Sequence, residues 1–340
     1  MAVLSVVNPT LLDLAKRTDP DGRIADIVEI LNETNEILMD MSWVEGNLPT
    51  GHRTTIRSGL PAPTWRKLYG GVQPTKSTTV QVTDNCGMLE AYSEVDKALA
   101  DLNGNTAAFR LSEDKPHIEG ISQEIADTIF YGNEGSEPEA FTGFAPRFNL
   151  TTASNGENII LGGGSDTDNA SIWLIVWGPN TAHGIVPKGS KAGLQMKDLG
   201  EVTIQDASNG SNTGRMQAYM THYRWDAGLA VRDWRYVVRI PNIDKSALSR
   251  VYTSGAFASP SANLPDLMFQ ATRRVPSLSM GRAAFYMSRD IESWVFRQTA
   301  AAVQGSTLTV DQVGGVLTSR FHGIPIRRCD ALSADEAVVS

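Results

Sequence analysis

Two loops come closest to known chemical motifs, and each departs from its motif at a decisive position. Residues 184–190 (GIVPKGS) have glycines spaced as in a phosphate-binding loop. The lysine, however, precedes the second glycine, and Pro187 lacks the amide hydrogen with which such a loop holds phosphate. We therefore expect a surface turn here.

Residues 162–169 (GGGSDTDN) resemble the start of a calcium-binding loop. The EF-hand pattern, counted from Asp166, requires glycine at its sixth position and glutamate at its twelfth. Ser171 and Trp177 stand at those positions. The sequence thus favours a flexible loop ahead of a strand over a metal site.

The histidines and cysteines give no local catalytic or metal-ligand pattern. His52, His117, His183, His222 and His322 lie far apart in the sequence, and none has a second histidine or a cysteine at ligand spacing. Two cysteines exclude a disulfide scaffold and a multi-cysteine metal site. We predict a protein that is not an enzyme and has no cofactor. An enzyme whose site is assembled from distant residues remains the minor alternative.

The composition describes a folded chain of about two domains' length. It has 340 residues, 41% of them apolar, and a net charge of −8, which excludes an intrinsically disordered protein. The apolar residues 1–7 lack the basic start of a signal peptide. The longest apolar run, 172–177, is far shorter than the roughly 20 residues of a membrane helix. We expect neither a standard secretion signal nor a membrane partner.

Charge is divided unevenly along the chain. Residues 1–45 carry a net −6 and residues 84–139 a net −10, whereas 46–83 carry five basic and no acidic side chains. A wholly basic segment between two acidic ones indicates contact with an acidic surface. The candidate contact residues are Arg53, Arg57, Arg66, Lys67 and Lys76. A solvated loop is the alternative interpretation.

The same basic segment is predicted to be a long β-hairpin. Residues 53–57 and 77–82 are strand-like, and glycines and prolines interrupt the stretch between them. Half of such a segment, fully extended, spans roughly 60 Å, whereas a compact body of this size has a radius of gyration of about 19 Å. The hairpin can therefore project well beyond its own fold. Trp65 and Tyr69 could stack on bases, but the acidic chain argues against a dedicated nucleic-acid binder.

The remaining periodicities predict a mixed α+β protein. We expect helices at 10–16, 24–31, 88–102, 116–130, 264–271 and 290–302. The buried stripe of the third would consist of Met88, Tyr92, Val95, Leu99 and Leu102. Pro116 is placed in the first turn of its helix, and Ser288 is expected to cap the last one. Strands are expected at 172–177 and 323–328, with a hairpin of 219–225 and 229–240 around 226–228 and a bulge near Asp233.

Five stretches, taken in order, resemble the major capsid proteins of tailed double-stranded DNA bacteriophages, in particular the short-tailed group. They are 141–148 (FTGFAPRF), 170–178 (ASIWLIVWG), 183–193 (HGIVPKGSKAG), 228–242 (GLAVRDWRYVVRIPN) and 321–327 (FHGIPIR). The resemblance implies a Hong Kong 97-type capsid fold. On this chain the parts would be an N-terminal arm (1–45), an extended loop (46–84), a peripheral domain with a spine helix and a sheet (85–250), and a mostly axial domain (251–340).

The resemblance also implies a function. The chain would assemble with copies of itself into the hexamers and pentamers of an icosahedral shell around a phage genome, in the cytoplasm of the host bacterium, and end in the virion. Scaffolding, decoration and portal proteins are further candidate partners, and packaged double-stranded DNA would be near the chain without specific binding. Another virion component, such as a tail or baseplate protein, is the alternative.

Overall fold

The structure is a computed structural model, and it describes residues 9, 13–14, 33–104, 106–205, 214–253, 256–257, 261–301, 308–313 and 316–340. Within the first predicted helix, Asp13 and Leu14 are helical; the rest of it and the helix predicted at 24–31 lie outside the described residues.

Helices and strands are mixed throughout the described part of the chain. Its α-helices are α2 (Ile37–Asp40), α3 (Lys97–Ala100), α4 (Thr106–Tyr131), α5 (Leu264–Arg274) and α6 (Arg289–Ala301). Its strands are β1 (Trp43–Glu45), β2 (Gly51–Gly59), β3 (Thr78–Asp96), β4 (Asn169–Trp177), β5 (Ala182–Val186), β6 (Gln195–Gln205), β7 (Arg215–Val231), β8 (Val237–Asp244), β9 (Tyr252–Thr253), β10 (Ala256–Phe257), β11 (Arg282–Met287), β12 (Leu308–Val313), β13 (Val316–Phe321) and β14 (Ile324–Arg328).

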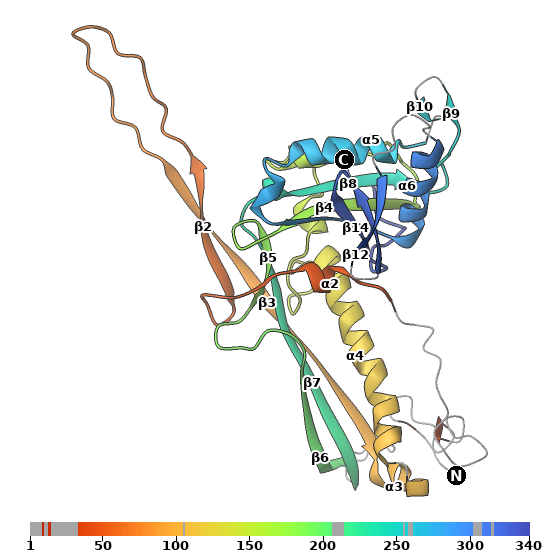
Figure 1. Ribbon diagram of the computed structural model, residues 1–340. Coiled ribbons are helices and arrows are strands. Elements are labelled where there is room, and N and C mark those ends of the chain that lie inside the picture. Colours follow the sequence, from red (N-terminus) through yellow and green to blue (C-terminus); the bar gives the residue numbers. More distant parts are fainter. Residues whose placement is uncertain are drawn as a thin grey trace.

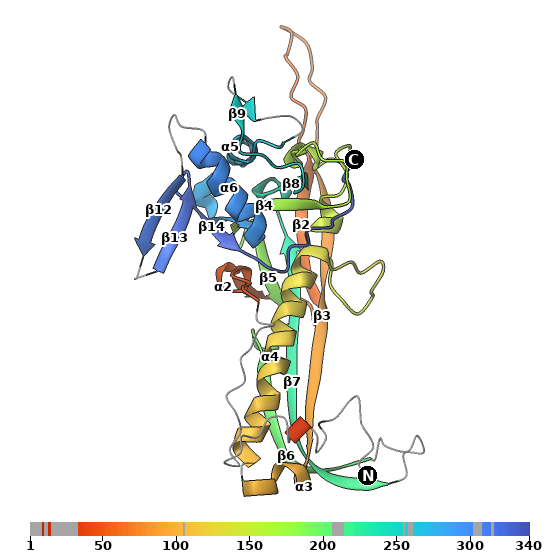
Figure 2. The ribbon, with the colours of Figure 1, turned by 90° about the vertical axis from the view of Figure 1, so that its right-hand side faces the viewer.

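The molecule is elongated and has three visible parts (Figure 1). A head contains β4, β8, β14 and the helices α5 and α6. Below it, α4 runs alongside the long strands β3, β7 and β6, and on the other side the hairpin of β2 and β3 extends past the head. Figure 2, turned by 90°, shows the same separation, so the hairpin projects from the body in both views.

The hairpin strands predicted at 53–57 and 77–82 are confirmed. β2 and β3 pair antiparallel from Gly51 opposite Asn85 to Gly59 opposite Thr78, with one irregularity after Arg57. Residues 60–77 then form the far end of the hairpin without strand pairing. Beyond Asn85, β3 continues into the body, where it pairs with β7. One strand thus connects the projection rigidly to the sheet.

Strand β4 separates two hydrophobic cores. Its side chains alternate: Trp173 and Ile175 join the core under α4, and Leu174 and Val176 join the core under α5 and α6. All nine residues of β4 are buried, which confirms the strand predicted from the apolar run 172–177. The segment after residue 250 therefore shares its core with β4 and β8.

The spine helix α4 is ten residues longer at its start than predicted. Ile121, Ile125 and Ile129 are buried as expected, but the helix begins at Thr106 and contains Pro116 in its interior. Proline is typical of the first turn of a helix because amide hydrogens there have no acceptor within the helix, so the missing one costs nothing. Here Pro116 lies on an exposed face, where the helix continues past it.

The helix predicted at 88–102 is wrong. This segment continues strand β3 as far as Asp96, and only the single turn α3 follows. Met88 and Tyr92, the expected start of a buried stripe, are 67% and 49% exposed. Val95 and Leu99 are buried as expected, but on the strand Val95 shares its buried face with Ser93, two residues earlier. Eleven paired residues between β3 and β7 determine the strand, a long-range interaction that local spacing does not reveal.

The hairpin predicted around residues 226–228 is also wrong. β7 runs unbroken through this segment and pairs first with β3 and then with β5. A Cβ on Gly228 would lie 2.7 Å from the carbonyl oxygen of Asn85 and 2.9 Å from Ile185 Cγ1, so the glycine permits close approach rather than a turn. At the expected bulge, Asp233 instead caps a 3-10 turn (Trp234–Tyr236) by accepting from the Arg235 amide.

The predicted elements of the C-terminal part are largely confirmed. α5, α6 and β14 lie where helices and a closing strand were expected. The Ser288 hydroxyl does not cap α6, however: it is buried and has no hydrogen-bond partner among the described residues, while its carbonyl accepts from the Glu292 amide. Among the helices of the described residues, none is both long and apolar enough to cross a membrane.

Candidate assembly surfaces

The five predicted contact residues all lie on the projecting hairpin and are all exposed. Arg53 and Arg57 belong to β2, near the root of the hairpin. Arg66, Lys67 and Lys76 belong to the far segment 60–77. None of the five forms an ion pair with another described residue, although Arg53 Nε donates a hydrogen bond to Thr83 Oγ1 (3.2 Å). Their charges are thus available to a partner.

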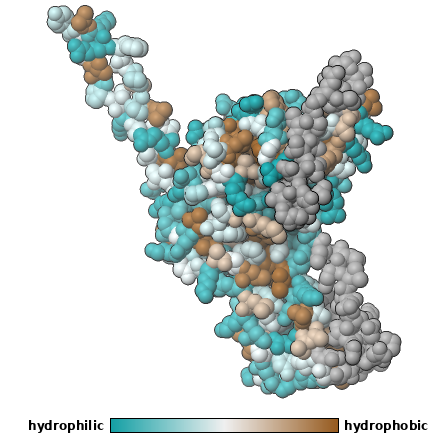
Figure 3. Space-filling model, viewed as in Figure 1, coloured by the Kyte–Doolittle hydropathy of each residue, from teal (hydrophilic) through white to brown (hydrophobic). Residues whose placement is uncertain are grey.

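The aromatic residues at the hairpin's far end were predicted from the sequence only as groups that could stack on bases, not as subunit contacts. Trp65 and Tyr69 are fully exposed, and Leu60 and Leu68 are more than four-fifths exposed. Tyr69 has φ 64°, and the Gly70 amide donates to the Lys67 carbonyl (3.1 Å), which forms a tight turn. Figure 3 shows hydrophobic residues interspersed with hydrophilic ones along this projection. Such exposed aromatic groups are typical of a binding surface.

The root of the hairpin is fixed by a largely buried ion pair. Asp84, 5% exposed on β3, accepts from Arg147 Nη1 at 2.8 Å. Arg147 also donates to the carbonyl oxygens of Thr142 (3.1 Å) and Leu229 (3.2 Å). The guanidinium therefore links β3, β7 and the aromatic loop after α4. This connection holds the direction in which the hairpin leaves the body.

A basic groove lies beside the hairpin root. It has a volume of about 850 Å³ and runs between β2 and the segment after β7. Arg53 and Arg57 line one side, and Arg232 and Arg235 line the other. Arg235 is paired with Asp233 at 2.6 Å. The groove extends the positive surface of the hairpin onto the body.

An acidic pocket lies between α4 and β3. It has a volume of about 390 Å³, and its apolar lining includes Met88, Leu89, Ile125, Phe141 and Trp225. Its charged lining consists of Glu124, Glu137 and Glu139, all exposed. Desolvation and repulsion from Glu124, Glu33 and Glu137 raise the pKa of the neighbouring Asp127. This surface has the opposite charge to the hairpin.

The fold does bring two histidines together, but in a setting unlike a catalytic site. The rings of His52 and His183 meet edge to face with centroids 5.9 Å apart, and both are buried. Burial and the nearby Arg232 lower the pKa of both, that of His183 to about 4. Neutral imidazoles packed against each other at the hairpin root serve a structural purpose there.

The remaining reactive groups are also accounted for structurally. Burial raises the pKa of the Cys86 thiol to about 12 and that of Cys329 still further, so both thiols stay protonated. Within the segment 184–190, residues up to Val186 form the buried strand β5, so the expected surface turn begins only at Pro187. The Gly189 amide donates to Glu45 Oε1 (2.9 Å), which occupies the donor that a phosphate would need.

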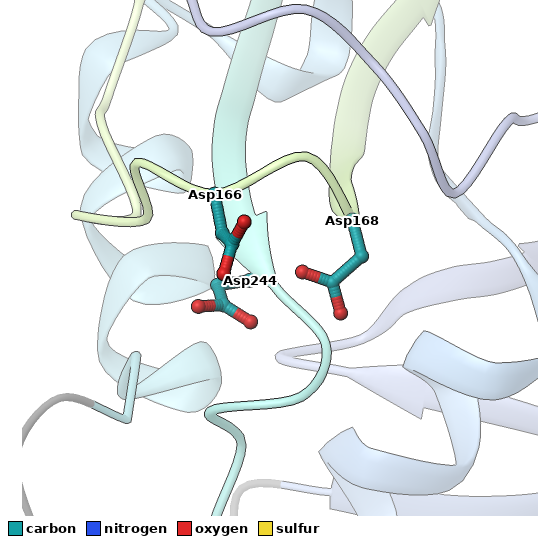
Figure 4. Close-up of side chains that lie close together, drawn as sticks. All are labelled: Asp166, Asp168 and Asp244. Carbon is teal, nitrogen blue, oxygen red and sulfur yellow. The ribbon is translucent and has the colours of Figure 1, made fainter.

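Three carboxylates lie within 4.8 Å of one another: those of Asp166 and Asp168, from the segment that leads into β4, and that of Asp244, at the end of β8 (Figure 4). Asp244 Oδ1 accepts from the Ser246 hydroxyl (2.8 Å) and the Ala247 amide (3.0 Å). The Ser246 amide donates to Asp168 Oδ2 (3.0 Å). These hydrogen bonds are those of turn-forming aspartates.

Comparison with known proteins gives a match over nearly the whole chain. Residues 19–340 match the family described as Major capsid protein GP7. A near-atomic structure of bacteriophage Epsilon15 contains a chain that is 38% identical, with 100% of each chain covered and a TM-score of 0.78.

More distant likenesses are found as well. A chain of the bacteriophage JBD30 capsid is 10% identical over 96% of this chain and 99% of that one, with a TM-score of 0.45. The SrpI encapsulin of Synechococcus elongatus PCC 7942 is 10% identical over 73% of this chain and 100% of that one, also with a TM-score of 0.45. A comparison with curated proteins gives no significant match.

The family match and the full-length similarity confirm the resemblance found in the sequence. The fold is the Hong Kong 97-type capsid fold, with a long spine helix and a sheet. The protein is structural and not an enzyme, it self-assembles into the capsid lattice, and its location is the virion. A tail or baseplate role is thereby excluded. The chain belongs to the GP7 family of phage major capsid proteins, the subunits of the icosahedral shell.

Proposed function

We propose that copies of this chain form hexamers and pentamers through the projecting hairpin, with its basic side chains in contact with a neighbouring subunit. The contact residues would be Arg53, Arg57, Arg66, Lys67 and Lys76. The observation that carries this proposal is that all five are exposed on a segment that leaves its own body and has no acidic residue. Heterologous contacts of this kind close into rings.

The division into an arm (1–45), an extended loop (46–84), a peripheral domain (85–250) and an axial domain (251–340) is also a proposal. The packing of α4 against β3 and β7 supports a peripheral unit, and α5, α6 and β11 to β14 suit an axial one. β4 and β8 connect the two. Scaffolding, decoration and portal proteins remain predicted partners. The net charge of −8 supports only nonspecific proximity to packaged DNA.

Reversal of charge at the hairpin root tests the proposal. Single exposed ion pairs contribute only ~0–1 kcal/mol, but a capsomer repeats each contact in every subunit. We expect Arg53→Glu with Arg57→Glu to leave the subunit folded, as seen by circular dichroism, and to prevent shell formation, as seen by electron microscopy. The matched control, Arg273→Glu with Arg274→Glu on α5, changes the charge equally and should assemble. Normal shells from the first variant would refute the contact role.

A further inference from the structure

The far end of the hairpin and the acidic pocket are complementary, and they lie on different parts of the molecule. We define the loop tip as residues 60–72; it presents fully exposed Trp65 and Tyr69 beside the cations of Arg66 and Lys67. The tip points away from α4 and from the sheet in both views (Figures 1 and 2). A tip that fills this kind of pocket therefore fills that of another copy.

Shape and polarity match at the centre of the two surfaces. The pocket volume of about 390 Å³ lies in the range of well-formed ligand pockets, ~300–1,000 Å³. Its floor is apolar and contains the aromatic rings of Phe141 and Trp225. Aromatic side chains that insert into such pockets dominate most interfaces. Trp65 and Tyr69 are the most exposed aromatic groups of the described residues.

At the rim of the pocket, the charges are opposite to those of the loop tip. Glu124, Glu137 and Glu139 surround the apolar floor and are exposed. Burial raises the pKa of the neighbouring Asp127, and repulsion from Glu124 and Glu137 raises it further. A cation placed at the rim relieves this repulsion. The projecting hairpin segment 46–83 supplies such cations, because it carries five basic side chains and no acidic one.

We propose that the loop tip of one subunit docks into the acidic pocket of a second copy, with Trp65 or Tyr69 over the apolar floor and Arg66 and Lys67 against Glu137 and Glu139. This inference rests on the proposed function and deepens it, because it names the receiving site. The hairpin root and the tip then have separate roles. The root determines the direction in which the hairpin projects, and the tip determines which surface of the second copy it binds.

Charge exchange is the first test. We expect Arg66→Glu with Lys67→Glu to lower the yield of shells by about tenfold or more, because two attractions per contact become repulsions. Adding Glu137→Lys with Glu139→Lys to the same chain should restore the yield to within about threefold of the original, since the pairs are re-formed with exchanged signs. A yield that stays low in the fourfold variant overturns the pairing.

Disulfide cross-linking is the second test, and it separates failure of the pocket from failure of the hairpin. In assembled particles of Arg66→Cys with Glu137→Cys, oxidation should give covalent oligomers on a non-reducing gel, because a disulfide needs Cα atoms within about 7 Å. Arg66→Cys with Glu157→Cys, which uses an exposed glutamate outside the pocket, should give none. Each single cysteine variant controls for reaction with the native Cys86 and Cys329.

The outcomes decide between the two proposals. Shells that form but do not cross-link at residue 137, or that cross-link equally at 157, overturn docking in the pocket and leave hairpin contact standing. Shells that form normally in the Arg53 and Arg57 charge-reversal variant overturn hairpin contact itself. Cross-linking at 137 alone, together with rescue by charge exchange, supports both.

Discussion

Removing the carboxylate of Glu336 should destabilise the subunit more than any change at its exposed charges. Glu336, in the C-terminal segment, pairs with Arg239 of β8 at 2.7 Å, and both side chains are 4% exposed. Its Oε1 accepts from the Tyr131 hydroxyl at 2.6 Å, and its Oε2 accepts from the Ser171 hydroxyl. One carboxylate thus joins the chain end to α4, β4 and β8.

The expected magnitude follows from that burial. Glu336→Ala leaves the Arg239 guanidinium buried without a counter-charge, and breaking a buried pair costs about 3–5 kcal/mol. Domains are stable by only ~5–15 kcal/mol, so the loss is about a fifth of the total or more. With a urea m value of ~3 kcal/mol per M, the unfolding midpoint should fall by about 1 M or more.

Two further variants make the test of Glu336 specific. Asp335→Ala removes the neighbouring exposed carboxylate and should change stability by less than about 0.5 kcal/mol. Arg239→Met with Glu336→Leu replaces the pair by apolar groups and should recover much of the loss, because no buried charge remains. A Glu336→Ala variant that loses less than about 1 kcal/mol would refute the reasoning.

Three other predictions concern the hairpin root, pH and the spine helix. Arg147→Met leaves Asp84 buried and unpaired, so we expect a loss of about 3 kcal/mol and faster limited proteolysis of the hairpin; equal proteolysis rates would contradict the anchoring role. Because the pKa of His183 is lowered from 6.5 to about 4, the unfolded chain binds more protons between these values, and stability falls as pH drops through that window, by ~2–3 kcal/mol at pH 4.5. His183→Gln should make the urea concentration at the unfolding midpoint less dependent on pH. The same substitution at the exposed His322 should leave that dependence unchanged. Pro116→Ala should raise the melting temperature, because alanine restores an amide donor and is favoured by up to ~3 kcal/mol inside a helix; an unchanged or lower melting temperature would show that the helix gains nothing there.

The sequence predicts best those elements whose signal is local. The run 172–177 indicated a strand buried on both faces, and β4 separates two cores in that way. The turn residues between 57 and 77 marked the hairpin, and the structure pairs its two strands. The basic candidate residues could be named because charge is read directly from the sequence, and the structure places all five on the exposed hairpin; their contact role stays a prediction.

The errors arise where distant segments decide the local conformation. Leu89, Ala91, Ser93 and Val95 form the covered face of β3. The helix was predicted because Met88, Tyr92 and Val95 are spaced by four and three residues, as on one face of a helix. Pairing with β7, more than a hundred residues away, selects the strand. The acidic pocket was missed for the same reason, since β3, β7 and α4 each contribute part of it. Its only sequence signal was the acidic block 84–139.

The separation of charge along the chain has a consequence for the symmetry of assembly. If basic hairpins met each other across a two-fold axis, like charges would be juxtaposed, and the same holds for two acidic pockets. A contact between a basic tip and an acidic pocket is instead heterologous. Each subunit then inserts its tip into one neighbour and accepts the tip of another in its own pocket. Such contacts propagate around a ring until it closes. On the proposed assignment, the uneven charge of residues 46–83 and 84–139 favours rings of subunits over isolated dimers.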